Sequence, residues 1–252
     1  MRGRDSTGDG SARPLDVLAI GPHPDDVELF CGGTVAGLVR RGYRVGILDL
    51  TAGERASNGT PKIRAAEARA AADVLGVDFR ECLGLPDLGL KADQAPELAL
   101  ALRRLAPRLV LAPVAVDRHP DHAAAAQLVE RAVFMANVAG FEPPGRHRVD
   151  EVLWYPTRVL VEPSFAVDIS ADVDAKRRAM QCHVSQLKGA RPTLVGAEDA
   201  LQRIEERDRF YGAQLGVAAA EPFVVHSRLG IDDPVAFFRS RSPAFFPERR
   251  SR

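Results

Sequence analysis

The sequence predicts an α/β fold: a mostly parallel, Rossmann-like sheet sandwiched by helices, followed by a mixed C-terminal part. Short apolar runs alternate with helical patterns before residue 150, which indicates successive strand–helix units. The runs are mostly apolar, as in strands that are buried on both faces. Two of them are followed, within a few residues, by a polar His-Pro-Asp segment. Ligands of open α/β sheets bind outside the carboxyl ends of the strands, so these segments are candidate site residues.

The first part of the chain contains four expected strands and four expected helices. Apolar runs predict the strands at 16–21, 44–50, 79–83 and 109–114. Apolar side chains three and four residues apart predict helices from Val27 to the glycine at 42 and over 62–75, 96–105 and 123–138. Gly76 ends the second of these helices, and Pro96 begins the third.

The pattern is less regular after residue 150. Strands are expected at 151–155, 165–169 and 223–226, with helices over 173–187 and 197–215. A chain of 252 residues suits one large domain, which we place at 15–238. The polar, Gly/Ser-rich segment 1–14 predicts a disordered tail, and the arginine-rich segment 239–252 predicts a solvated basic tail.

Composition and charge disfavour several kinds of partner. The 34 Lys and Arg residues balance 34 Asp and Glu residues, so there is no basic field to bind nucleic acid. No apolar run is as long as a membrane span, so no membrane partner is expected. The three cysteines are widely spaced, without a C-x-x-C pair. They favour a reducing compartment, and we expect a cytoplasmic protein.

Two segments carry the residue types that metal-assisted hydrolysis needs: HPDD at 23–26 and HPDH at 119–122. Imidazoles and a carboxylate are common ligands of a catalytic zinc ion, which keeps one position open for water. His23 and Asp26 can chelate one ion, and His122 can complete the set from the neighbouring loop. Asp25 is then left to accept the proton of the metal-activated water as general base. Zinc is the expected cofactor, one ion per chain, with another divalent metal as the alternative.

Five segments resemble a known family: PHPDDVELFCGGT, LTAGERASNGTPKIRAAE, DRHPDHAAA, KRRAMQCHVSQ and RFYGAQLGVAAAEPF. The chain is similar in these segments to the PIG-L/LmbE-like N-acetylglucosaminyl deacetylases. It looks closest to the bacillithiol-pathway enzymes, which deacetylate a glucosaminyl-malate precursor. Pro22 departs from the alanine that is frequent in the family and leaves the ligand positions intact.

The resemblance implies a role for each matching residue. His23, Asp26 and His122 match zinc ligands, and Asp25 matches the general base. His119 matches a histidine that assists the tetrahedral intermediate, with Asp121 as its partner. The other implied site residues are Tyr211 near the reaction centre and, for substrate binding, Asn58, Arg118 and Arg64, the last at the pocket mouth.

The expected activity is hydrolysis of a linear amide: removal of the acetyl group from an N-acetylglucosamine conjugate, with N-acetylglucosaminyl-malate as the expected substrate. The resemblance also suggests a homotrimer or homohexamer. One alternative is another acylated amine, such as diacetylchitobiose or an antibiotic intermediate. A non-catalytic sugar-binding relative is disfavoured because the base and all three ligands are retained. A nucleotide-binding regulator is disfavoured because no phosphate-cradling glycine loop is present.

Overall fold

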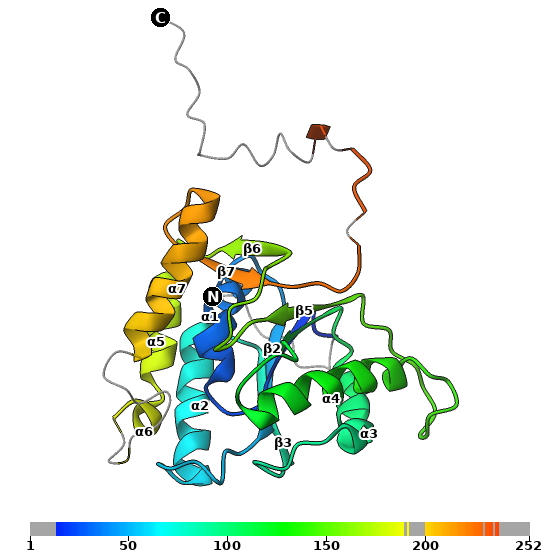
Figure 1. Cartoon of the computed structure of the whole chain (residues 1–252). Coiled ribbons are helices and arrows are strands. Elements are labelled where there is room, and N and C mark those ends of the chain that lie inside the picture. Colours follow the sequence, from blue (N-terminus) through cyan, green and yellow to red (C-terminus); the bar gives the residue numbers. More distant parts are fainter. Residues whose placement is uncertain (1–13, 189–190, 192–199, 229, 234, 237–252) are drawn as a thin grey trace, which may run out of the picture.

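The central sheet of the computed structural model has five parallel strands in the order β3-β2-β1-β4-β5. The structure describes residues 14–188, 191, 200–228, 230–233 and 235–236. The strands are β1 (Val17–Gly21), β2 (Val45–Thr51), β3 (Phe79–Leu85), β4 (Leu109–Pro113) and β5 (Glu151–Tyr155) (Figure 1). The predicted fold class is confirmed.

The order of the strands positions the site. β1 is fully buried and pairs with β2 on one side and with β4 on the other. The chain runs outward from β1 in both directions, so the sheet has its switch point between β1 and β4. The segments that follow these two strands therefore leave the same edge of the sheet side by side.

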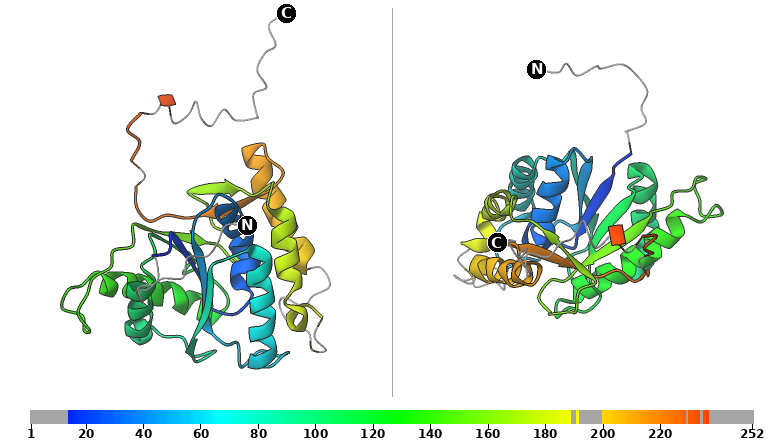
Figure 2. Two further views of the ribbon diagram at one scale, coloured as in Figure 1. Left: turned by 180° about the vertical axis from the view of Figure 1, so that it is seen from behind. Right: turned by 90° about the horizontal axis from the view of Figure 1, so that it is seen from above.

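Helices cover both faces of the sheet, as Figure 2 shows with blue and cyan helices on one side and green helices on the other. The helices α1 (Asp26–Arg40), α2 (Pro61–Leu75) and α5 (Val173–Gln181) pack together on one face. The short 3₁₀ helix η1 (Ala92–Gln94), α3 (Ala95–Leu105) and α4 (Pro120–Ala136) lie on the other. Successive side chains of a strand point to opposite faces. Accordingly, Leu18 belongs to the core beneath α3 and α4, and Val17 belongs to the core beneath α1 and α2.

The C-terminal part is mixed, as expected. β6 (Phe165–Asp168) and β7 (Ala220–Phe223) form a two-stranded antiparallel sheet, and Val224 bridges to Trp154 of β5. α7 (Ala200–Leu215) packs on this small sheet. The strand predicted at 223–226 was wrong by three residues, because Glu221 is buried as an ion-pair partner and belongs to the strand.

Two helix predictions also need correction. The helix expected over 173–187 is two helices, α5 and α6 (Val184–Leu187), because the chain turns at Cys182 and His183. The helix expected at 123–138 begins at Pro120, since the His119 ring caps it by accepting a hydrogen bond from the Asp121 amide. By contrast, α2 ends as predicted, with Gly76 in the left-handed conformation.

Helix α1, which carries the first site segment, is broken at Cys31. The second half of the helix leaves free amide groups, and the Glu221 carboxylate accepts hydrogen bonds from Gly33 N (2.9 Å) and Thr34 N (2.6 Å). Lys176 Nζ of α5 donates to the same carboxylate at 2.6 Å. Glu221 and Lys176 are almost completely buried, so β7 and α5 together hold the break in α1.

The tails predicted at 1–14 and 239–252 lie outside the described residues, apart from Pro14, and so do residues 197–199 of the last predicted helix. Among the described residues, no helix has both the length and the apolar character needed to cross a bilayer.

Candidate active site

Three histidines from two neighbouring loops meet at the carboxyl edge of the sheet. His23 follows β1, while His119 and His122 follow β4 at the start of α4. The ring centroids of His23 and His119 are 4.8 Å apart, and those of His23 and His122 are 5.5 Å apart. The structure therefore brings together the two His-Pro-Asp segments, as their positions after adjacent strands predicted.

The Asp26 carboxylate lies between two of these imidazoles. Its Oδ2 is 3.1 Å from His23 Nδ1, and its Oδ1 is 3.2 Å from His122 Nε2. All three residues are buried, and each can offer a ligand atom within 4.8 Å of the others. Two imidazoles and one carboxylate form a donor set that can hold a metal ion.

Each of the two imidazoles is held from behind by a further carboxylate. His122 Nδ1 is 3.0 Å from Asp117 Oδ2, which leaves its Nε2 toward Asp26. His23 Nε2 is 3.2 Å from Asp87 Oδ1, which leaves Nδ1 toward Asp26. Carboxylates that orient histidine ligands in this way are typical of metal sites.

The surrounding charge also fits a cation. Burial alone would lower the pKa of His23, but hydrogen bonds to carboxylates, above all Asp121, raise it well above its ordinary value. Against the same effect of burial, Asp26 raises the pKa of His122 to about 9. The carboxylates thus favour positive charge between these residues, and a divalent metal ion supplies it.

Asp25 stands at the N-terminus of α1 without capping it through its side chain. Its Oδ1 accepts a hydrogen bond from Arg64 Nη2 at 3.2 Å. Burial raises the pKa of the Asp25 carboxyl group, and the nearby Arg64 guanidinium opposes that rise. Asp25 is therefore a carboxylate beside the candidate metal ligands that the helix does not use.

Arg64 is 3% exposed and is held behind Asp25, not at the pocket mouth where it was expected. Besides Asp25, its guanidinium donates to the carbonyl oxygens of Pro24 (3.2 Å) and Gly53 (3.4 Å). A side chain at position 53 would collide with this guanidinium, so the glycine leaves room for it. Thr60 caps α2 and sets the helical turn that carries Arg64. These contacts indicate that Arg64 orients Asp25.

His119 and Asp121 are close, but their side chains do not pair as expected. His119 Nδ1 accepts a hydrogen bond from the Asp121 amide at 3.3 Å, which leaves the ring proton on Nε2. Burial, followed by the charge of His23, lowers the pKa of His119. The Asp121 carboxylate instead accepts from the Leu88 amide at 2.6 Å and lies 3.5 Å from His23 Nε2. A neutral His119 can thus donate a hydrogen bond through Nε2.

These groups face a pocket of about 300 Å³. His23, Asp25, Asp26, His119 and His122 line it, together with two cations that sequence reasoning missed, Arg55 and Arg158. Asn58 is not among the lining residues. Its side-chain amide forms hydrogen bonds with the backbone of Arg191. The backbone carbonyl oxygen of Asn58 accepts a hydrogen bond from Gln186, which does line the pocket.

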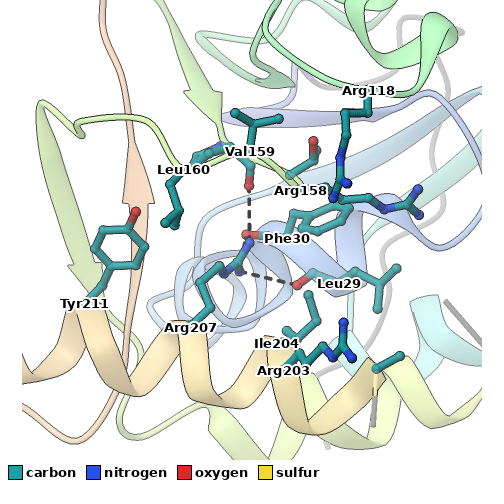
Figure 3. A pocket seen from close by; sticks show the side chains of 13 residues that line it. Leu29, Phe30, Arg118, Arg158, Val159, Leu160, Arg203, Ile204, Arg207 and Tyr211 are labelled. Carbon is teal, nitrogen blue, oxygen red and sulfur yellow. Dashed lines mark hydrogen bonds between the residues drawn. The ribbon is translucent and has the colours of Figure 1, made fainter. Parts of the chain in front are cut away.

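Two further predicted residues line a different pocket. Arg118 and Tyr211 border a neighbouring hollow of about 330 Å³ between α1, α7 and residues 156–160 (Figure 3). Tyr211 does not line the pocket of the histidines, because it projects from α7 on the far side of Phe30. Arg158 lines both pockets.

Asp87 and Asp117, like the two cations, were not predicted. Asp87 follows β3 within an LPD segment, at the same sheet edge as His23. Asp117 precedes His119 by two residues. Both residues lie just beyond the end of a strand. That position in the sequence indicates that a residue is near the site, but it does not indicate which side chain the residue contacts.

Comparison with known proteins identifies relatives by sequence and by fold. The family model PIG-L, described as GlcNAc-PI de-N-acetylase, matches residues 18–133, which include all three candidate ligands. The crystal structure of the conserved protein TT1542 from Thermus thermophilus superposes with a TM-score of 0.80 at 42% identity. The match covers 86% of this chain and 98% of that chain.

Three curated relatives differ in the reactions that their names describe. Diacetylchitobiose deacetylase of Thermococcus kodakarensis is 31% identical over 68% of this chain and 69% of that protein. A probable N-acetyl-alpha-D-glucosaminyl L-malate deacetylase 2 of Bacillus cereus is 28% identical over 76% and 90%. A 4-oxalmesaconate hydratase of Pseudomonas putida is 26% identical over 68% and 73%. Sequence and fold agree, and the chain belongs to the PIG-L family of de-N-acetylases, as its motifs predicted.

Proposed function

We propose that this deacetylase is a zinc-dependent hydrolase that removes the acetyl group from an N-acetylglucosamine conjugate with an anionic aglycone. N-acetylglucosaminyl-malate is one such conjugate. The observation that carries the proposal is the buried set of His23, Asp26 and His122, with the Asp25 carboxylate beside it, which does not cap the helix. Such a set suits the hydrolysis of an amide, whose amine is a poor leaving group.

When it is bound by His23, Asp26 and His122, zinc supplies Lewis acidity, which polarises the acetyl carbonyl group and lowers the pKa of water. Asp25 accepts a proton from the attacking water, whose oxygen forms a bond to the carbonyl carbon. Asp25 then returns that proton to the amide nitrogen as the C–N bond breaks. The products are acetate and a free amino sugar.

Besides Asp25, His119 and Arg64 contribute to the reaction, each in a different way. Negative charge develops on the carbonyl oxygen during the attack, and the His119 Nε2–H group can donate a hydrogen bond to it. The lowered pKa of His119 keeps its ring neutral, so Nε2–H acts as a hydrogen-bond donor. Arg64 keeps the Asp25 carboxylate oriented through its 3.2 Å hydrogen bond. It is therefore a positioning residue.

The proposal of an anionic aglycone is supported by the pocket arginines that have no carboxylate partner in the described part of the chain. Arg64 also lines the pocket but is committed to Asp25. Arg55 and Arg158 line it too, and neither forms a hydrogen bond or ion pair through its side chain with the described residues. A guanidinium group binds a carboxylate in a bidentate manner. These cations favour a malate conjugate over the neutral disaccharide diacetylchitobiose.

A competition assay tests both the reaction and the substrate. The purified zinc-loaded enzyme is given N-acetylglucosaminyl-malate, methyl N-acetylglucosaminide and N,N′-diacetylchitobiose, and amine release is measured. We expect the malate conjugate to have the highest kcat/KM. If the disaccharide is preferred, the anionic aglycone is wrong and the deacetylation stands.

The hydratase among the relatives defines the competing reaction. Hydration of an unsaturated polycarboxylate would also use an activated water and nearby cations, and would be followed as the loss of ultraviolet absorbance of the conjugated acid. Hydration of such an acid without any release of amine from the three amino sugars would refute the proposed function.

We also propose that the protein is cytoplasmic and forms a homotrimer or homohexamer. The three cysteines are free in the structure, which suits a reducing compartment. Light scattering on the purified protein measures the assembly, and a monomer in solution would contradict that part of the proposal.

A further inference from the structure

The second pocket, beside the histidines, has mainly apolar walls. Leu29 and Phe30 of α1 face Ile204 and Tyr211 of α7 across it, and Leu160 stands at its border (Figure 3). Leu160 is 78% exposed, whereas Leu29 and Phe30 are buried. An apolar hollow of about 330 Å³ is therefore open to a ligand beside the proposed reaction centre.

The charged groups around this pocket are all cations. Arg118, Arg158, Arg203 and Arg207 line it, and no carboxylate does among the described residues. Arg207 is occupied, since it donates to Asp208 Oδ1 at 2.8 Å and to Phe30 O at 3.2 Å. Arg118 and Arg158 form no hydrogen bond or ion pair with other described residues. Figure 3 shows their guanidinium groups together, at the end of the pocket away from Tyr211.

The two pockets adjoin at Arg158, which lines both. Thr157, which lines the second pocket, is hydrogen-bonded to Asp117, the carboxylate behind His122. The rings of Phe30 and His122 also lie edge to face, with centroids 6.4 Å apart. A molecule whose acetamido group lies at the histidines can therefore extend past Arg158 into the apolar pocket.

We propose that the second pocket binds the aglycone of the substrate, and that this aglycone combines an apolar body with a carboxylate. The inference rests on the proposed function and narrows its substrate class. The carboxylate lies at Arg118 and Arg158, and the apolar body lies between Phe30 and Ile204. Tyr211 then contributes to the choice of aglycone and not to the reaction at the acetyl group.

Four glycosides of N-acetylglucosamine separate the two contributions: methyl, carboxymethyl, benzyl and 4-carboxybenzyl. Burial of a benzyl ring and pairing of the carboxylate should each raise kcat/KM roughly tenfold over the methyl glycoside. The 4-carboxybenzyl glycoside should therefore be the best of the four. If the benzyl glycosides are no better than their counterparts without the ring, the proposal is wrong.

Two variants locate the effect in the second pocket. Ile204→Trp fills the pocket and should remove most of the advantage of the benzyl glycosides, whereas Gln202→Trp, on an exposed position of the same helix, should preserve it. Arg118→Gln should reduce the advantage of the carboxylates about tenfold, and the exposed Arg69→Gln on α2 should not. An advantage that persists in both Ile204→Trp and Arg118→Gln would overturn the assignment even if deacetylation is normal.

Calorimetry distinguishes this inference from the proposed function. The same four glycosides are titrated into the Asp25→Asn variant, which retains the pocket. Ranked binding without turnover of any glycoside by the wild type would refute the deacetylation and preserve the second binding site. Turnover of the methyl glycoside, with all four glycosides binding equally, would support the deacetylation and refute the second binding site.

Discussion

Replacing Arg64 with methionine tests whether this arginine orients the base or binds the substrate. Methionine fills a similar space but cannot donate the hydrogen bonds to Asp25, Pro24 and Gly53. Arg64 is 3% and Asp25 5% exposed, so solvent cannot replace the lost partner. A hydrogen bond to a charged group contributes about 1.5–3 kcal/mol. If that energy stabilises the transition state through Asp25, kcat falls roughly 10- to 150-fold.

The assay compares kcat and KM for the malate conjugate and the methyl glycoside. An orienting role predicts that Arg64→Met lowers kcat equally for both substrates, with KM changed by less than about threefold. Zinc content, measured by elemental analysis, should stay near one ion per chain. Arg55→Met is the matched control at an exposed position of the same pocket and should raise KM for the malate conjugate. If Arg64→Met leaves kcat intact and removes the preference for malate, the reasoning from its burial is refuted.

The remaining predictions concern the metal and the base. Alanine in place of any one ligand should lower the zinc content, and chelation should abolish activity; full occupancy in all three variants, His23→Ala, Asp26→Ala and His122→Ala, would contradict the ligand set. Asp25→Asn should keep zinc while kcat falls roughly 10²–10⁴-fold, and near wild-type turnover would exclude it as the base. Asp117→Asn should weaken zinc binding by about 10–100-fold, because it no longer fixes the His122 ring; a competition titration with a chelator measures this.

The strands could be predicted, and the candidate metal ligands proposed, because their signals are local. A strand buried on both faces requires a continuous apolar run, and a chelating pair at the entry of a helix has a fixed spacing. β1, β4 and the two His-Pro-Asp segments were found in this way. The bend at His183 was missed because the apolar spacing continues across it.

The roles of Arg64 and Tyr211 depend on tertiary packing. Whether an arginine reaches solvent or turns back onto a carboxylate depends on what lies against its helix, and for Arg64 that neighbour is the loop at Gly53. Tyr211 lies on a helix whose rotation is set by packing on β6 and β7. Asp87 and Arg158 were missed for the same reason, since each reaches the site from a different strand end.

The contacts of Glu221 and Lys176 at the break in helix α1 have a consequence for biosynthesis. A ribosome makes the chain from its N-terminus, so the proposed ligands His23, Asp26 and His122 are all present once the first half is complete. Glu221, which closes the break beside Cys31 together with Lys176, is added only near the end. A nascent or truncated chain that stops before β7 thus contains every proposed ligand and lacks the anion that caps the second half of α1. Metal capture and full activity should therefore be separable in time, the second appearing only after β7 has emerged and docked.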